Sequence, residues 1–165
     1  MSSTLDNFTR KFKTLEEVVK IVETFRSERI IVAKNGSYDM IHPGHIRALY
    51  ESKAQGEMLI VGLDSDESIR KRKGKGRPIN PQEYRAEVLA AIECVDFVTL
   101  IEDSVEFVKA IKPHVYTNGS EWGENCKEAE TVKRNGGKIY IYQRHDNYST
   151  TDLIRRIKNA QWWSR

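Results

Sequence analysis

The stretch that most constrains the fold of this chain is residues 30–47, where an apolar run leads directly into a motif rich in glycine and histidine. Residues 30–32, Ile-Ile-Val, form a β-branched run that predicts a buried strand of a parallel sheet. Residues 35–47 then read Asn-Gly-Ser-Tyr-Asp-Met-Ile-His-Pro-Gly-His-Ile-Arg. Because Pro43 is typical of the first turn of a helix, the stretch predicts a strand, a tight turn and a helix start in succession.

A helix that begins directly after a buried strand offers a site for anions. Its first backbone N–H groups have no partner inside the helix, and the helix dipole places partial positive charge there. His42 and His45 are three residues apart, so their imidazoles are predicted to project from one side of the first turn and donate to phosphate oxygens. A helix cap and a zinc site remain as alternatives. The three-residue spacing, with no cysteine or third histidine nearby, favours phosphate over zinc.

The composition predicts a single domain with reduced thiols. A chain of 165 residues has room for one domain with a real core. Its net charge of +3 is too small to favour nucleic acid as a partner. Cys94 and Cys126 have neither a close partner nor metal-ligand spacing, and the sequence shows neither a transmembrane run nor a secretory signal. We therefore expect a cytoplasmic protein that binds neither membranes nor nucleic acid.

Apolar runs that alternate with helical patterns predict the fold class. Buried strands are expected at residues 30–34, 58–63, 96–101, 115–117 and 138–142. This alternation predicts a single Rossmann-like α/β domain whose five-stranded parallel sheet is flanked by helices. Ligands bind such sheets where the strand order reverses, and the first strand is the expected switch point.

The helix signals place the remaining elements. Helices are expected to begin at a capping box over residues 14–17, at Pro43, Asn80 and Asp103, near residue 124 and at Ser149. In the helix that Asn80 begins, Val88 is expected to face inward and Arg85 to lie on the exposed side. Residues 1–13 lack periodicity and are expected to be a loose lead-in to a domain at residues 14–165.

A basic segment at residues 70–78 follows the second predicted strand. Six of its nine residues are cationic and two are glycine. Its composition leaves a solvated face or a nucleic-acid patch open. Its position at a strand end favours a mobile lid that folds over a bound polyphosphate. It is not a Walker loop, because Gly76 is followed by Arg77 rather than by Lys and a hydroxyl residue.

Ser149, Thr150 and Thr151 place three successive hydroxyls at the start of the last predicted helix. This is a second phosphate cradle, although Ser149 also suits a simple cap. Two cradles, a histidine pair and a cationic segment together suit a nucleoside triphosphate with Mg²⁺. No nucleophile stands beside a base, which favours attack on the α-phosphorus by a phosphate monoester, because this group is already ionised near neutral pH.

The two motifs also carry a resemblance to a known family. His42-Pro43-Gly44-His45 together with Tyr148-Ser149-Thr150-Thr151 resembles the cytidylyltransferase-like nucleotidyltransferase superfamily. Residues 35–39, 73–81 and 85–89 further resemble the bacterial D-glycero-β-D-manno-heptose 1-phosphate adenylyltransferases, over about residues 14–158. The sugar kinase domain often fused to this activity is absent, so the resemblance implies a stand-alone form.

The resemblance implies a role for each motif residue. His42 and His45 would stabilise the α-phosphate in the transition state, and Lys73 would bridge the donor and acceptor phosphates. The nucleotide would be bound by Asn35, Gly36, Ser37, His42, His45, Gly119, Glu121, Arg144, Ser149, Thr150 and Thr151. The acceptor would be bound by Arg77 and Arg85 at its phosphate, with Asp39 and Asp66 for sugar hydroxyls or metal. Mg²⁺ would be carried by the phosphates of ATP, without a dedicated protein site.

Three hypotheses for the function follow. The first is transfer from ATP to heptose 1-phosphate, giving ADP-heptose and pyrophosphate for lipopolysaccharide synthesis. The second is a CTP-dependent glycerol 3-phosphate cytidylyltransferase, which Asn118, the run Gly119-Ser120-Glu121-Trp122 and Arg144 resemble more. The third is a nucleotide- or nucleic-acid-binding module without catalysis. The resemblance also implies a homo-oligomer, and Trp162 and Trp163 are compatible with an interface.

Overall fold

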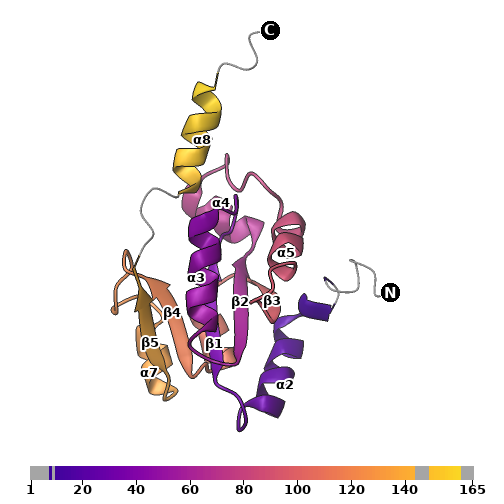
Figure 1. Ribbon diagram of the computed structural model, residues 1–165, viewed down its shortest axis with the longest axis vertical. Coiled ribbons are helices and arrows are strands. Elements are labelled where there is room, and N and C mark those ends of the chain that lie inside the picture. The colour runs from indigo at the N-terminus through magenta and orange to yellow at the C-terminus, as the bar shows by residue number, and fades with distance from the viewer. Residues whose placement is uncertain (1–7, 9, 144–148, 161–165) are drawn as a thin grey trace.

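A five-stranded, all-parallel sheet forms the centre of the computed structural model, which describes Phe8, residues 10–143 and residues 149–160 (Figure 1). The strands are β1 (Ile31–Gly36), β2 (Met58–Asp64), β3 (Phe97–Ile101), β4 (Val115–Gly119) and β5 (Lys138–Tyr142). They lie in the order β3-β2-β1-β4-β5, and every neighbouring pair is parallel. This confirms the predicted Rossmann-like fold, with the order reversing at β1.

Helices cover both faces of the sheet. They are α2 (Leu15–Phe25), α3 (Pro43–Lys53), α4 (Asp66–Lys73), α5 (Gln82–Ala90), α6 (Ser104–Ile111), α7 (Ala129–Arg134) and α8 (Thr150–Asn159). Side chains of α2, α6 and α7 join one apolar core, and those of α3 and α5 join the other. Successive residues of β1 alternate between these cores: Ile31 and Ala33 enter the first and Val32 the second. None of the helices described combines the length and apolar character needed to cross a bilayer.

Local capping signals fix where several helices begin. Thr14 and Glu17 form the predicted capping box at the start of α2, and Asp103 caps α6 by accepting bonds from two backbone N–H groups. Ser149 caps α8, with its Oγ 3.0 Å from the backbone nitrogen of Asp152. The helix starts predicted from these polar residues are therefore confirmed.

The lead-in was predicted to be loose up to residue 13, and its described part is attached to the sheet instead. Phe12 forms a parallel bridge to Val98 at the outer edge of β3, and the backbone nitrogen of Lys13 donates to the Val98 carbonyl over 3.0 Å. Phe12 also packs against the core formed with α3 and α5. The prediction failed because a single bridge carries no periodicity that a sequence can reveal.

The basic segment was predicted to be a mobile lid, and its first half is helical. Residues 70–73 are the last turn of α4, which Ser65 caps at its start. Acidic residues occupy the first turn and cations the last, an arrangement that the helix dipole stabilises. Only the part from Gly74 to the start of α5 is a connecting loop.

Four predictions of helix boundaries and side-chain burial were also wrong. Pro81, not Asn80, is the N-cap of α5, and the Asn80 side chain donates instead to the Asp39 carbonyl over 2.6 Å. Val88 is 49% exposed rather than inward-facing, and Arg85 is 1% exposed rather than outward-facing. Helix α7 begins at Ala129, several residues after the predicted start.

Removing a large core side chain tests this packing. Phe107 of α6 is fully buried against the sheet, so Phe107→Ala leaves a cavity and is expected to lower the free energy of unfolding by about 3–5 kcal/mol. The matched control is Tyr84→Ala, because Tyr84 is 64% exposed and its loss is expected to change stability by no more than about 0.5 kcal/mol. Urea denaturation measures both, and equal effects would contradict the assigned packing.

Candidate active site

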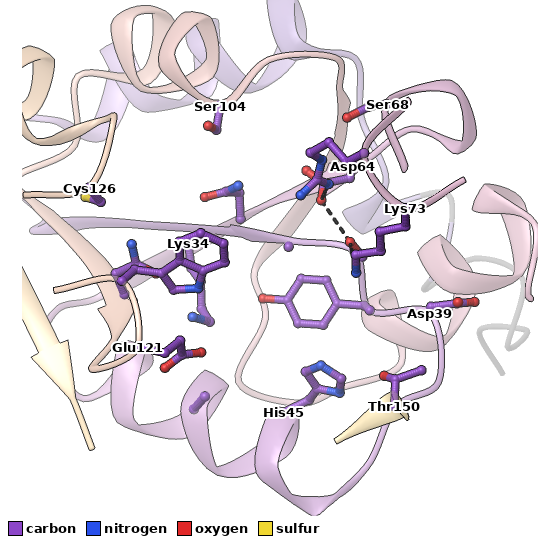
Figure 2. A pocket seen from close by; sticks show the side chains of 18 of the residues that line it. Lys34, Asp39, His45, Asp64, Ser68, Lys73, Ser104, Glu121, Cys126 and Thr150 are labelled. Atoms are coloured by element: carbon purple, nitrogen blue, oxygen red, sulfur yellow. Dashed lines mark hydrogen bonds and ion pairs between the residues drawn. The ribbon is translucent and has the colours of Figure 1, made fainter. Parts of the chain in front are cut away.

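A polar cleft of about 1070 Å³ opens at the carboxyl edge of the sheet. Figure 2 shows side chains from the early and late parts of the chain around it, including His45 and Thr150. Twelve of the predicted site residues line the cleft: Asn35, Gly36, Ser37, Asp39, His42, His45, Lys73, Arg77, Glu121, Ser149, Thr150 and Thr151. The histidine motif and the hydroxyl motif, which lie far apart in sequence, therefore meet in space.

Four predicted site residues are not among those that line the cleft. Asp66 and Arg85 lie behind its wall, and Arg144 falls outside the described residues. Gly119 acts through its small size, since an added Cβ there would lie 2.1 Å from a carboxylate oxygen of Glu121. The glycine thus allows the Glu121 side chain to fold back against the end of β4.

The two motif histidines stack at the start of α3. Their ring centroids are 3.8 Å apart, and the ring of Tyr38 lies 5.3 Å from that of His45. His42 is the N-cap residue, but no side chain of the described part of the chain caps α3 by a hydrogen bond. Pro43 has no backbone N–H, and those of His45 and Ile46 donate to the His42 carbonyl, which leaves the N–H of Gly44 at this helix start for an anion.

His45 is held as a neutral imidazole. Burial, followed by the nearby charges of His42, Lys34 and Lys73, lowers its pKa to about 3. Its Nδ1 is buried and has no hydrogen-bond partner among the described residues. Because an unpartnered buried nitrogen is costly, the ring is suited to a ligand oxygen that completes its hydrogen bonding.

Lys73 stands opposite the histidines, at the end of α4. Its Nζ donates to Ser37 Oγ over 3.1 Å, and that hydroxyl donates to Asp64 over 3.1 Å (Figure 2). Arg72 also pairs with Asp64. Burial, followed by the charges of Arg77 and Arg72, lowers the pKa of Lys73, so a bound polyphosphate would relieve a real repulsion there.

Arg85 is a structural brace in this structure. Its guanidinium donates to the carbonyls of Asn80, Ser37 and Asp64 at 2.6–3.0 Å and pairs with Asp66 at 2.7 Å. Four contacts occupy most of its five N–H donors. Arg85 and Asp66 therefore hold each other and the cleft wall, and the prediction that Arg85 lies exposed on its helix was wrong for this reason.

Asp39 anchors the loop that carries Arg77. Its buried carboxylate accepts from Arg77 Nε at 2.6 Å and from the backbone nitrogens of Ile79 and Asn80 at 2.7 and 2.9 Å. These bonds occupy both carboxylate oxygens. Arg77 still lines the cleft, with Asp39 fixing its direction.

Sequence reasoning missed Lys34 and Tyr142, which line the cleft floor. Lys34 is 5% exposed in the second half of β1, and its Nζ donates to the Tyr142 hydroxyl over 2.5 Å. Burial lowers the pKa of Lys34 to about 7 and raises that of Tyr142. The available signal was a lysine two residues after the β-branched run, within a buried strand, where charged side chains are rare.

Comparison with known proteins agrees with this geometry. Residues 33–156 match the family described as Cytidylyltransferase-like, so the chain belongs to that family and is a nucleotidyltransferase. It is 36% identical over 158 residues to the Bifunctional protein HldE of Aliarcobacter butzleri (strain RM4018), covering 94% of this chain and 33% of that protein. It is 35% identical over 161 residues to the same-named protein of Campylobacter fetus subsp. fetus (strain 82-40), covering 96% and 34%. The chain thus spans about a third of the length of these relatives.

Two solved structures share the fold. The lipopolysaccharide core biosynthesis protein from Thermoplasma volcanium GSS1 superposes with a TM-score of 0.58 at 29% identity, over 73% of this chain and 99% of that one. The pantoate-beta-alanine ligase of Francisella tularensis superposes with a TM-score of 0.58 at 14% identity, over 90% of this chain and 77% of that one. The family resemblance seen in the two motifs is confirmed.

Acidification is expected to destabilise the free protein through His45. Its pKa is about 3 in the folded chain against about 6.5 in the unfolded one, so the unfolded state binds more protons between these values. The free energy of unfolding therefore falls as pH drops from about 6.5 towards 3. We expect His45→Gln to lose less stability than the wild type between pH 7 and pH 5, measured by urea denaturation. An equal loss in both proteins would contradict the burial of a neutral His45.

Proposed function

We propose that the chain transfers the adenylyl group of ATP to D-glycero-β-D-manno-heptose 1-phosphate, releasing pyrophosphate and forming ADP-heptose. The observation that carries this proposal is the meeting of His42 and His45 with Thr150 and Thr151 in one cleft. Two helix N-termini, α3 and α8, begin at that cleft, which suits several consecutive phosphates. A triphosphate is long enough to contact both helix N-termini at once.

The proposed mechanism relies on alignment and charge rather than on a protein nucleophile. An oxygen of the acceptor phosphate attacks the α-phosphorus of ATP, and the bond to the pyrophosphate oxygen breaks in line. His42 and His45 donate to the α-phosphate oxygens, and Lys73 spans the two substrates. The hydroxyls of Ser149 and Thr150 hold the leaving phosphates. No base is required, because the acceptor monoester is already ionised.

Mg²⁺ is proposed to enter with ATP as part of the substrate. Two carboxylates that line the cleft beside Lys73 are already engaged, Asp39 by Arg77 and Asp64 by Arg72. Phosphate oxygens are hard ligands that suit Mg²⁺, so the chain needs only to bind the complex. The protein groups that face the phosphates are then cations and hydroxyls.

The choice of heptose rests on the relatives. HldE proteins match most of this chain at 35–36% identity, and a lipopolysaccharide core biosynthesis protein shares its fold. CTP with glycerol 3-phosphate is the second candidate. It is favoured by the run from Asn118 to Trp122, in which the Asn118 side chain accepts from the backbone nitrogen of Gly119 over 3.1 Å.

A substrate panel tests the proposal directly. We expect pyrophosphate release with ATP and heptose 1-phosphate to exceed that with CTP, GTP or UTP, and with glycerol 3-phosphate or glucose 1-phosphate, by at least roughly tenfold in kcat/KM. Coupled pyrophosphate detection measures each pair with Mg²⁺ present. Turnover with CTP and glycerol 3-phosphate alone would replace the first candidate by the second. The absence of turnover, together with salt-sensitive binding of nucleic acid, would replace both.

Loss of one motif histidine is expected to impair the chemical step. His45→Ala removes a donor to the α-phosphate and should lower kcat by on the order of a hundredfold or more, with a folded structure retained. The matched control is His114→Ala, since His114 lies away from the cleft and accepts a bond from the Ile31 backbone nitrogen. That change should lower stability and leave kcat within about twofold. Near-normal turnover by His45→Ala would contradict the mechanism.

A further inference from the structure

Lys34 is a buried cation for which the proposed reaction has so far no use. It lies in the second half of β1, with its Nζ 2.5 Å from the Tyr142 hydroxyl and 4.3 Å from the centroid of that ring. It is 5% exposed and lines the cleft. A buried ammonium is costly unless it is compensated, and a neutral phenol compensates it only in part. Such a group is a candidate to bind substrate.

The cleft has two ends, and Lys34 belongs to the end away from the phosphate cradle. Figure 2 shows Lys73, Asp39 and Thr150 to one side of His45, with Lys34 and Glu121 to the other. In the proposed function the β- and γ-phosphates lie towards Thr150. The ribose is joined to the α-phosphate by one ester link, so it must lie beside His45 on the opposite side. Lys34 is near enough to His45 that its charge lowers the pKa of the imidazole.

We propose that Lys34 and Tyr142 bind the ribose of the nucleoside triphosphate, with Glu121 completing the contact. The resemblance to the family assigns Glu121 to the nucleotide but gives no role to the other two residues. The inference rests on the proposed function, because the position of the α-phosphate at the histidine pair fixes which end of the cleft the ribose occupies.

The chemistry of the three side chains matches a vicinal diol. Each ribose hydroxyl both donates and accepts a hydrogen bond. The ammonium of Lys34 donates, and the Tyr142 hydroxyl donates its own proton because it already accepts from Lys34. The carboxylate of Glu121 accepts. Glu121 also interacts favourably with the Lys34 charge, so the donor and acceptor groups stand close together.

Affinity labelling tests the placement. ATP whose ribose has been oxidised to the 2′,3′-dialdehyde keeps its phosphates and carries aldehydes where the hydroxyls were. The Lys34 amine condenses with one aldehyde with loss of water, and borohydride delivers hydride to the resulting imine. Since its lowered pKa leaves part of this amine unprotonated at pH 7.5, we expect Lys34 to be the main site labelled, with protection by unmodified ATP. Peptide mass spectrometry identifies the lysine.

A substitution separates ribose binding from phosphate binding. Lys34→Met keeps an unbranched side chain and removes a buried charge, so it is expected to fold. We expect kcat/KM for ATP to fall by roughly tenfold to a hundredfold, the range for a hydrogen bond to a charged group, and that for 2′,3′-dideoxy-ATP to change by less than about threefold. Tyr142→Phe should show the same pattern at smaller amplitude. Lys109→Met, on the exposed side of α6, is the matched control and should change neither value.

The outcomes distinguish this inference from the proposed function. Equal losses for ATP and its dideoxy analogue in Lys34→Met, or ATP-protected labelling of Lys73 in place of Lys34, would overturn ribose binding by Lys34 and leave nucleotidyl transfer intact. Failure of the wild-type protein to bind or turn over any nucleoside triphosphate would overturn both. Selective loss for ATP together with labelling at Lys34 supports the inference.

Discussion

Divergence of the chain at the carboxyl ends of two adjacent strands creates the space on which the whole site depends. After β1 the chain runs to α3 on one face of the sheet, and after β4 it runs to α7 on the other face. Neighbouring connections that leave in opposite directions cannot fill the gap between them. The cleft is therefore a consequence of strand order. Side chains at that edge, such as Lys34, Asn35 and Asn118, line it whatever their chemistry.

A buried polar brace then gives the edge its shape. A guanidinium without water must find protein acceptors, and Arg85 takes carbonyls from the segment after β1, the end of β2 and the turn before α5. The buried Asp39 carboxylate holds the loop of Arg77 in the same way. If any of these segments moved, a buried charged group would lose its hydrogen-bond partners. The positions of Ser37 and Lys73 are therefore set before a substrate binds. Preorganisation of this kind is what charge stabilisation in a transition state requires.

Features that depend on neighbouring residues could be predicted from the sequence, and features that depend on contacts between distant residues could not. The alternation of apolar runs predicted five strands and their class, and polar caps predicted the starts of α2, α6 and α8, because these signals are local. The cleft that joins the histidines to the hydroxyls was expected from the two motifs. The burial of Arg85 was not, since its acceptors come from segments 5 to 48 residues away. Lys34 was missed because its contact with Tyr142 joins β1 to β5, with β4 between them, and a contact so distant in sequence leaves no local pattern.

The electrostatics of the cleft favour a polyanion. Lys34, His45 and Lys73 all have lowered pKa values, with burial as the leading cause in each case and neighbouring positive charge as a further cause for the latter two. Their protonated forms are therefore disfavoured in the free protein and favoured once phosphate charge enters. Any ligand that binds only the folded chain also stabilises it. Binding of a triphosphate should thus be accompanied by proton uptake and should raise the free energy of unfolding. Ligand binding, protonation and stability at this site are therefore thermodynamically linked.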